Sequence, residues 1–263
     1  NHMHPQLAQE IRDFHPHGIL SQLQRRNHDI VRVVQAARIP TVELCWVSGM
    51  DVPRIVPDET AVGTLVARHL LDRGFTRFVY VGQSQSEQYP GFSQIVRAAG
   101  HEYHAIFIDD PKMQTELGPV TVSSPMVHDA RFSLPRAWAR RFFAHCATPG
   151  GVYTESTGWA TAIAGGWRDV HILVPEQVAL VSLADEADEG KILPLPLTVV
   201  VRDYEEQGYQ AAALLDRMIK GKPVPPDRVV TIPPLALVPR MSTMCHATTD
   251  LPIARATTFI MSN

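Results

Sequence analysis

Several features that mark common protein classes are missing from this sequence. Its 263 residues include three cysteines, Cys45, Cys146 and Cys245, which are dispersed and form no Cys-x-x-Cys pair. An odd, dispersed set argues against a disulfide framework and against a structural zinc site. No apolar run approaches the roughly 18 residues of a membrane-spanning helix, and no signal segment opens the chain. We therefore predict a cytoplasmic protein that makes no contact with membranes.

An excess of basic residues is also absent. The chain has 24 Lys and Arg against 27 Asp and Glu, a formal net charge of −3. A global positive field that would attract nucleic acid is therefore lacking. We predict that this chain by itself does not bind DNA.

The sequence also lacks the short motifs of common enzymes. It contains no G-x-x-x-x-G-K-[ST] loop, no G-x-G-x-x-G after a strand and no G-x-S-x-G elbow. Acidic pairs such as Asp185-Glu186 and Glu205-Glu206 are typical of a solvated loop and of a helix N-terminus, where the helix dipole favours them. We predict a protein that is not an enzyme, with no catalytic residue and no cofactor.

The 12 histidines raise the alternative of a metal site. Four of them cluster near the start of the chain: His2, His4, His15 and His17. They lie in a leading segment without a nearby cysteine, so we predict no metal site.

What the sequence does contain is an alternation of strand and helix patterns, with 45% hydrophobic residues. Strand-like runs occupy residues 41–46, 78–82, 103–108, 151–154, 178–181 and 198–201. Helical periodicity fills most of the intervals, best at 58–73, where Gly74 stops the helix. Such alternation predicts an α/β fold with parallel sheets joined by right-handed crossovers. In open sheets of this kind, ligands bind beyond the carboxyl ends of the strands.

Several blocks from Arg54 onward resemble the sugar-binding module of the lac-repressor and periplasmic-binding-protein superfamily. They occur in the order expected for that family: Val56-Pro57-Asp58-Glu59-Thr60-Ala61-Val62-Gly63, Phe78-Val79-Tyr80-Val81-Gly82 with Gly91-Phe92, Val174-Pro175-Glu176-Gln177-Val178-Ala179, Gly208-Tyr209-Gln210-Ala211-Ala212 and Pro233-Pro234-Leu235 with Val238-Pro239-Arg240-Met241-Ser242-Thr243. The last block and the Gly208 block are most similar to the xylose operon regulator branch. The resemblance implies a bacterial transcription regulator that senses a pentose-like sugar, xylose or a related one.

The resemblance also implies a division into two sub-lobes joined by several crossover strands. We place one lobe at about 1–57 plus 200–222 and the other at about 58–199 plus 226–241, together forming an effector-binding module over 1–241. Before Gly18 the family has a further βαβ unit, so the opening lobe looks incomplete. Residues 242–263 resemble a linker and the start of an AraC-type helix-turn-helix domain. The resemblance therefore implies a homodimer that contacts DNA through a domain absent from this chain.

Sugar contacts are expected at strand ends, where planar and charged polar groups suit vicinal hydroxyls. The predicted ligand-binding residues are Gln88, Glu155, Asp185 and Arg202, with Trp46 or Tyr204 as an apolar platform. Trp46 and Tyr204 could equally be core aromatics. The chain departs from the family pattern, because Gln88 stands where an arginine is usual, and Ala184 and Val201 stand where aspartates are usual.

These departures leave an alternative function open. Either the ligand differs, or the cleft is vestigial and the same fold serves as a ligand-independent dimerisation and interaction module. The sequence does not identify the effector or the operon, or distinguish activation from repression.

Overall fold

The computed structural model describes residues 9–11, 13–22, 28–46, 50–112, 149–184 and 195–262. The chain divides into two compact units, each built from two stretches of sequence. Unit 1 consists of Asn1–Asp58 and Asp203–Pro233, and unit 2 of Glu59–Arg202 and Pro234–Asn263. Residues 134–146, one of the intervals with helical periodicity in the sequence, lie outside the described residues.

Unit 1 contains a parallel sheet of four strands in the order β1-β2-β3-β9. The strands are β1 (Ile19–Ser21), β2 (Thr41–Glu43), β3 (Arg54–Pro57) and β9 (Val229–Ile232), with helix α2 (His28–Ala37) between the first two. Our prediction placed residues 226–241 together in the second lobe, and this is wrong for β9. The backbone groups of β9 pair with β3 over four residues, which fixes β9 in unit 1.

Helix α9 (Tyr204–Ile219) packs on β1, β2 and β3 of unit 1. Asp203 caps its first turn by accepting a hydrogen bond from the Glu206 amide at 2.9 Å. One buried side chain fastens it to the sheet, because Gln207 donates from Nε2 to the carbonyls of Leu44 at 2.9 Å and Ile55 at 2.8 Å. Ala211 and Leu214 continue this buried face into the core of unit 1.

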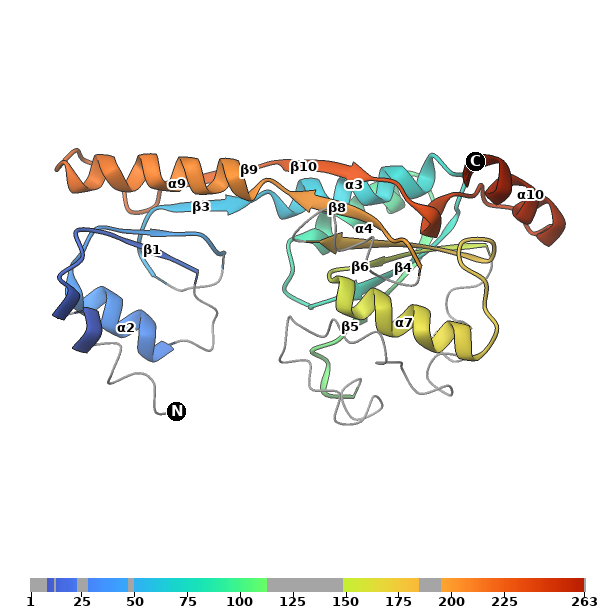
Figure 1. Cartoon of the computed structure of the whole chain (residues 1–263), viewed down its shortest axis with the longest axis horizontal. Coiled ribbons are helices and arrows are strands. Elements are labelled where there is room, and N and C mark those ends of the chain that lie inside the picture. Colours follow the sequence, from blue (N-terminus) through green and yellow to red (C-terminus); the bar gives the residue numbers. More distant parts are fainter. Residues whose placement is uncertain are drawn as a thin grey trace. The chain divides into compact units, whose positions relative to one another are not determined.

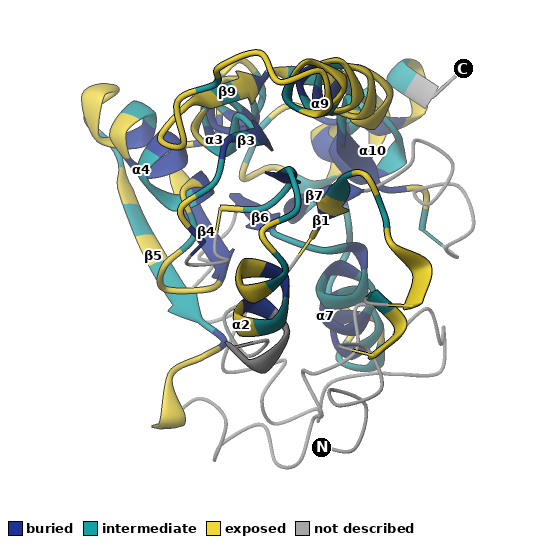
Figure 2. Cartoon of the chain, turned by 90° about the vertical axis from the view of Figure 1, so that its left-hand side faces the viewer, coloured by how far each residue is buried: buried dark blue, intermediate teal, exposed yellow. Residues whose placement is uncertain are grey.

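Unit 2 contains a sheet of six strands in the order β10-β8-β7-β6-β4-β5. The strands are β4 (Arg77–Gly82), β5 (Glu102–Phe107), β6 (Gly150–Thr154), β7 (Val178–Ala184), β8 (Thr198–Arg202) and β10 (Pro234–Val238). All neighbours are parallel except β10, which runs antiparallel to β8 at the sheet edge. The central strands β4, β6 and β7 are dark blue in Figure 2, because their residues are buried on both faces, whereas edge strand β5 is partly exposed.

Successive residues of these strands supply two different cores. On β4, Val79 and Val81 belong to a mainly aliphatic cluster that includes Trp167 of α7 (Thr157–Asp169). Phe78 and Tyr80 alternate with them and belong to an aromatic-rich cluster with α3 (Glu59–Leu71) and α4 (Gln88–Ala98). Figure 1 shows α7 on one side of the sheet and α3 and α4 on the other. This double cover explains why the strands read as continuous apolar runs.

Helices α3 and α4 approach each other so closely that glycine is required at the contact. A Cβ atom on Gly63 would lie 2.1 Å from the Gln88 carbonyl oxygen, and one on Gly91 would lie 2.1 Å from the Thr60 carbonyl oxygen. No real side chain fits at either place. The contact holds the first turn of α4 against the first turn of α3.

The chain ends in unit 2 with a one-turn helix, η2 (Met241–Thr243), and helix α10 (Leu251–Ser262). Asp250 caps α10 by accepting a hydrogen bond from the Ile253 amide at 3.1 Å. Among the described helices, none is long and apolar enough to cross a membrane.

Candidate functional site

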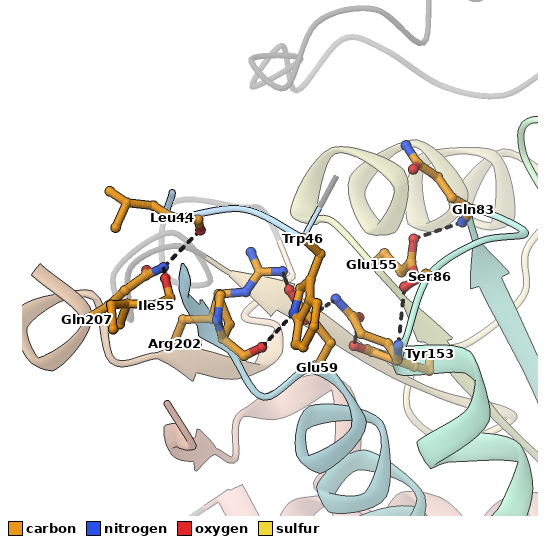
Figure 3. A network of polar contacts seen from close by, with 12 residues as sticks. Leu44, Trp46, Ile55, Glu59, Gln83, Ser86, Tyr153, Glu155, Arg202 and Gln207 are labelled. Carbon is orange, nitrogen blue, oxygen red and sulfur yellow. Dashed lines mark hydrogen bonds and ion pairs between the residues drawn. The ribbon is translucent and has the colours of Figure 1, made fainter. Parts of the chain in front are cut away.

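A network of polar side chains in unit 2 is centred on Glu59, the first residue of α3 (Figure 3). Arg202, the last residue of β8, donates from a terminal guanidinium nitrogen to Glu59 Oε1 at 2.5 Å. Gln88, the first residue of α4, donates from Nε2 to Glu59 Oε2 at 2.7 Å. The Arg202 and Glu59 side chains remain 18% and 13% exposed, so both can be reached by solvent. This arrangement brings a cation, an anion and an amide from three elements to one place.

The amide of Gln88 is held at both ends. Its Oε1 atom accepts a hydrogen bond from the hydroxyl of Tyr153, while its Nε2 donates to Glu59. Gln88 is 4% exposed, and Tyr153 is fully buried. Burial and the neighbouring carboxyl of Glu155 raise the pKa of Tyr153 well above its ordinary value, so its hydroxyl stays a donor. Gln88 therefore orients Glu59.

A second carboxyl group, that of Glu155, lies directly after β6. It accepts hydrogen bonds from the Tyr80 hydroxyl and, at Oε2, from the Gln83 amide at 2.8 Å. Burial raises the pKa of Glu155, and the hydrogen bonds from Ser86, Tyr80 and Gln83 counteract that shift. The two tyrosines that bond to Glu155 and Gln88 are neighbours. The ring centroids of Tyr80 and Tyr153 are 5.7 Å apart, and we call this pair the aromatic wall.

The structure brings together some of the predicted site residues. Gln88 and Arg202 both bind Glu59, and Glu155 lies beside the aromatic wall behind them. Trp46 and Tyr204 belong to unit 1, where their side chains are 36% and 37% exposed, and the Trp46 ring donates to the Pro57 carbonyl at 3.0 Å. Asp185 lies outside the described residues. The assignment of these residues to ligand binding stays a prediction.

Sequence reasoning missed Glu59, Tyr80 and Tyr153. Glu59 carried a usable signal, because it opens the helix that follows a crossover strand. The two tyrosines gave none, since both lie inside apolar strand patterns. The substituted positions Ala184 and Val201 are buried in the aliphatic cluster, so neither supplies a polar side chain to the site.

Unit 1 has a polar pair at its own strand ends. Ser21, the last residue of β1, donates to Glu43 Oε2 at 2.5 Å, and the Cys45 amide donates to Glu43 Oε1 at 3.2 Å. Glu43 ends β2 and is fully buried.

An apolar pocket of about 380 Å³ lies elsewhere in unit 2. It is formed by α7 between Thr161 and Arg168 and by residues 171–174, 195 and 197, and none of the residues bonded to Glu59 lines it. Its walls are mainly Ala, Ile, Leu and Val side chains, which do not suit a polyol. Within the described part of the chain, no three His, Cys, Asp or Glu side chains gather as a metal site.

The fold and the strand-end network define a class of protein: α/β proteins of two units whose polar groups gather at the carboxyl ends of parallel strands. Residues 67–243 match the family model of the periplasmic binding protein-like domain, and the chain belongs to this family. Both the resemblance noted in the sequence and the predicted fold class are thereby confirmed.

Curated relatives match over a shorter region. The xylose operon regulatory protein of Escherichia coli strain K12 is 29% identical over 94 residues, which are 36% of this chain and 24% of that protein. The match thus spans about a quarter of the relative's length.

Solved structures match over most of the chain. A periplasmic binding protein/LacI transcriptional regulator from Alkaliphilus metalliredigens, complexed with D-xylulofuranose, has a TM-score of 0.64 and 17% identity over 90% of this chain and 81% of that one. A xylose-binding transcription activator has a TM-score of 0.69 and 17% identity over 98% of this chain and 70% of that one. A LacI family regulator from Enterococcus faecium with bound ribose has a TM-score of 0.67 and 17% identity, over 91% of this chain and 83% of that one. At these identities the likeness is one of fold.

Proposed function

We propose that this chain is the effector-binding domain of a bacterial transcription regulator of the xylose-regulator type, and that it binds a neutral pentose-like sugar. The observation that carries the proposal is the convergence of Arg202, Glu59 and Gln88 at the strand-end edge of unit 2. A guanidinium donates to one hydroxyl of a vicinal diol while a carboxylate accepts from the next, so the Arg202–Glu59 pair suits a sugar.

Within this proposal the polar residues divide into two roles. Arg202 and Glu59 are the partly exposed pair and would contact the sugar. Gln88 and Glu155 already have protein partners and would position that pair and the wall behind it. Trp46 or Tyr204 would supply the apolar platform, and Asp185 a further polar contact.

The comparisons support the same function for the whole protein. The curated relative is named for the xylose operon, and the structural neighbours include a xylose-binding transcription activator and regulators with bound ribose or cellobiose. We further propose that the complete protein is a cytoplasmic homodimer. Its sugar-dependent change would pass to an AraC-type DNA-binding domain beyond α10.

A ligand-independent interaction module is the second candidate. It is favoured by the same contacts that satisfy Gln88 and Glu155 inside the protein, because they reduce the polar capacity left for a ligand. Sedimentation across a concentration series and thermal unfolding, each with and without sugar, distinguish the two candidates. A module of this kind dimerises equally with and without sugar, whereas an effector domain shows sugar-dependent stabilisation.

Calorimetry with D-xylose should give a dissociation constant no better than roughly millimolar, about −4 kcal/mol. The reason is that Gln88, Ala184 and Val201 replace the charged residues usual in the family, and each lost hydrogen bond costs about 0.5–1.5 kcal/mol. Glu59→Gln and Arg202→Gln should abolish the remaining signal. Asp216→Asn, which removes an exposed ion pair in α9, serves as the control. Micromolar binding would contradict this view of the site, and no shift in melting temperature with any pentose would contradict the proposed function.

A further inference from the structure

The far end of α3 is clamped to the segment that leads out to α10. Arg73, two residues beyond the end of α3, donates from Nε to the Thr243 carbonyl at 2.8 Å. Its own carbonyl accepts from the Ala247 amide at 2.9 Å. These two bonds hold residues 241–247, which we call the exit segment, from the α3 side.

The sheet holds the exit segment from the other side. Ser242 donates to the Leu180 carbonyl of β7 at 2.5 Å and accepts from the Thr198 amide of β8 at 2.8 Å. The Cys245 thiol, itself buried, donates to the Pro175 carbonyl at 3.1 Å. The exit segment therefore bridges α3 and the sheet.

Thr243 is the residue at which these two sets of bonds meet. Its buried hydroxyl lies 3.0 Å from His69 Nε2 on α3 and 2.7 Å from Thr198 Oγ1 on β8. Arg73 lies 3.1 Å from His69 Nδ1 and can only donate, which assigns the imidazole proton to Nε2. The imidazole then donates to Thr243, which donates to Thr198. If α3 moves along the sheet, Thr243 loses its hydrogen bond either to His69 or to Thr198.

Helix α3 connects these contacts of Thr243 with the polar network around Glu59. The helix spans about 18 Å from its first residue to its last. Its start is locked to α4 by the Gly63 and Gly91 backbone contacts, so Glu59, Gln88 and α3 move together. Through α3, the Arg202–Glu59 pair is thus connected to the contacts of Thr243 at the other end.

We propose that the exit segment senses the position of α3 against the six-stranded sheet, with Thr243 as its switching residue. The proposal rests on the proposed function in that the ligand is what would shift Glu59. Effector binding at Glu59 would change how firmly residues 241–247 are held, and so how α10 and the chain beyond it are presented.

Cys245 provides a built-in reporter of the exit segment. The test uses the full chain with Cys45→Ser and Cys146→Ser, and measures the rate at which Ellman's reagent modifies Cys245 without any sugar. Thr243→Val, which removes the hydroxyl but keeps the shape, should raise that rate about tenfold or more, while Thr243→Ser stays within about twofold. Glu59→Gln, at the opposite end of α3, should raise it about threefold or more. In the Glu59→Gln/Thr243→Val double variant, the increase in the Cys245 modification rate should be smaller than the product of the two single-variant increases.

The matched control is Asp216→Asn, which neutralises an acidic residue of unit 1 and should leave the rate unchanged. Repeating the reaction in low urea separates local opening from global unfolding, since only global unfolding accelerates steeply with urea. An unchanged rate in Glu59→Gln, or effects that multiply in the double variant, would overturn the proposal. A positive Glu59→Gln result with no response to D-xylose would contradict the proposed function and leave the coupling standing.

Discussion

Replacing Gly91 by alanine should lower the free energy of unfolding by about 3 kcal/mol or more. The new Cβ would lie 2.1 Å from the Thr60 carbonyl oxygen, and neither backbone can give way without separating α3 from α4. The same displacement would pull Gln88 away from Glu59, so the variant should lose any sugar response as well. Urea unfolding followed by circular dichroism measures the first effect, and thermal shift with D-xylose the second.

Gly208→Ala is the matched control, because the same chemical change is made where nothing lies within 4 Å. Gly208 is in the interior of α9 on its exposed side, so alanine should stabilise the helix by about 0.5–1 kcal/mol. Gly63→Ala should behave like Gly91→Ala, since its Cβ would meet the Gln88 carbonyl at the same distance. If Gly91→Ala has the same urea midpoint of unfolding as the wild type, the two helices do not approach as closely as described.

The protein should lose about 2 kcal/mol of stability between pH 7 and pH 5 through His69 alone. Burial, and then the neighbouring Arg73 charge, lower the pKa of His69 from 6.5 to about 4. The unfolded chain therefore takes up a proton on this residue between pH 6.5 and 4, while the folded protein resists it. The contribution of His69 to the free energy of unfolding is fully present above pH 6.5 and is lost as the pH falls toward 4.

His69→Gln should flatten this pH dependence by about the same 2 kcal/mol, since glutamine does not titrate. It should also lower stability at pH 7, because the Arg73 and Thr243 contacts are rebuilt imperfectly. His246→Gln, made at an exposed residue of the exit segment, serves as the matched control. Urea titrations at half-unit pH steps give the slopes, and equal slopes for wild type and His69→Gln would contradict the assigned shift.

Most of the unit 2 strands and helices could be predicted from the sequence, because their apolar runs and helical faces are long and local. The family blocks then predicted the fold class. The pairing of β9 with β3 could not be predicted, since β9 is four residues long and pairs with a strand distant in the sequence. A short run of that kind fits either sheet until the other strands are in place.

The candidate site was predicted in part for the same reason. Arg202 and Gln88 were expected at strand ends, but the residue that joins them, Glu59, is 143 positions from Arg202. Their meeting depends on the strand order, which local patterns do not encode. The burial of Gln88 could not be predicted from local patterns either, because it follows from the close approach of α4 to α3 at Gly63 and Gly91.

The two faces of the six-stranded sheet should accumulate substitutions at different rates during evolution. On the α7 face the cluster is made almost entirely of aliphatic side chains, which can exchange volume with one another at little cost. On the opposite face, Tyr80 and Tyr153 combine a large ring with a hydroxyl that has a named acceptor, so few replacements preserve both. Lineages of this domain are thus expected to drift freely on one side of the sheet. Changes on the other side should come in concert, with Glu59, Gln88 and Glu155 altering together.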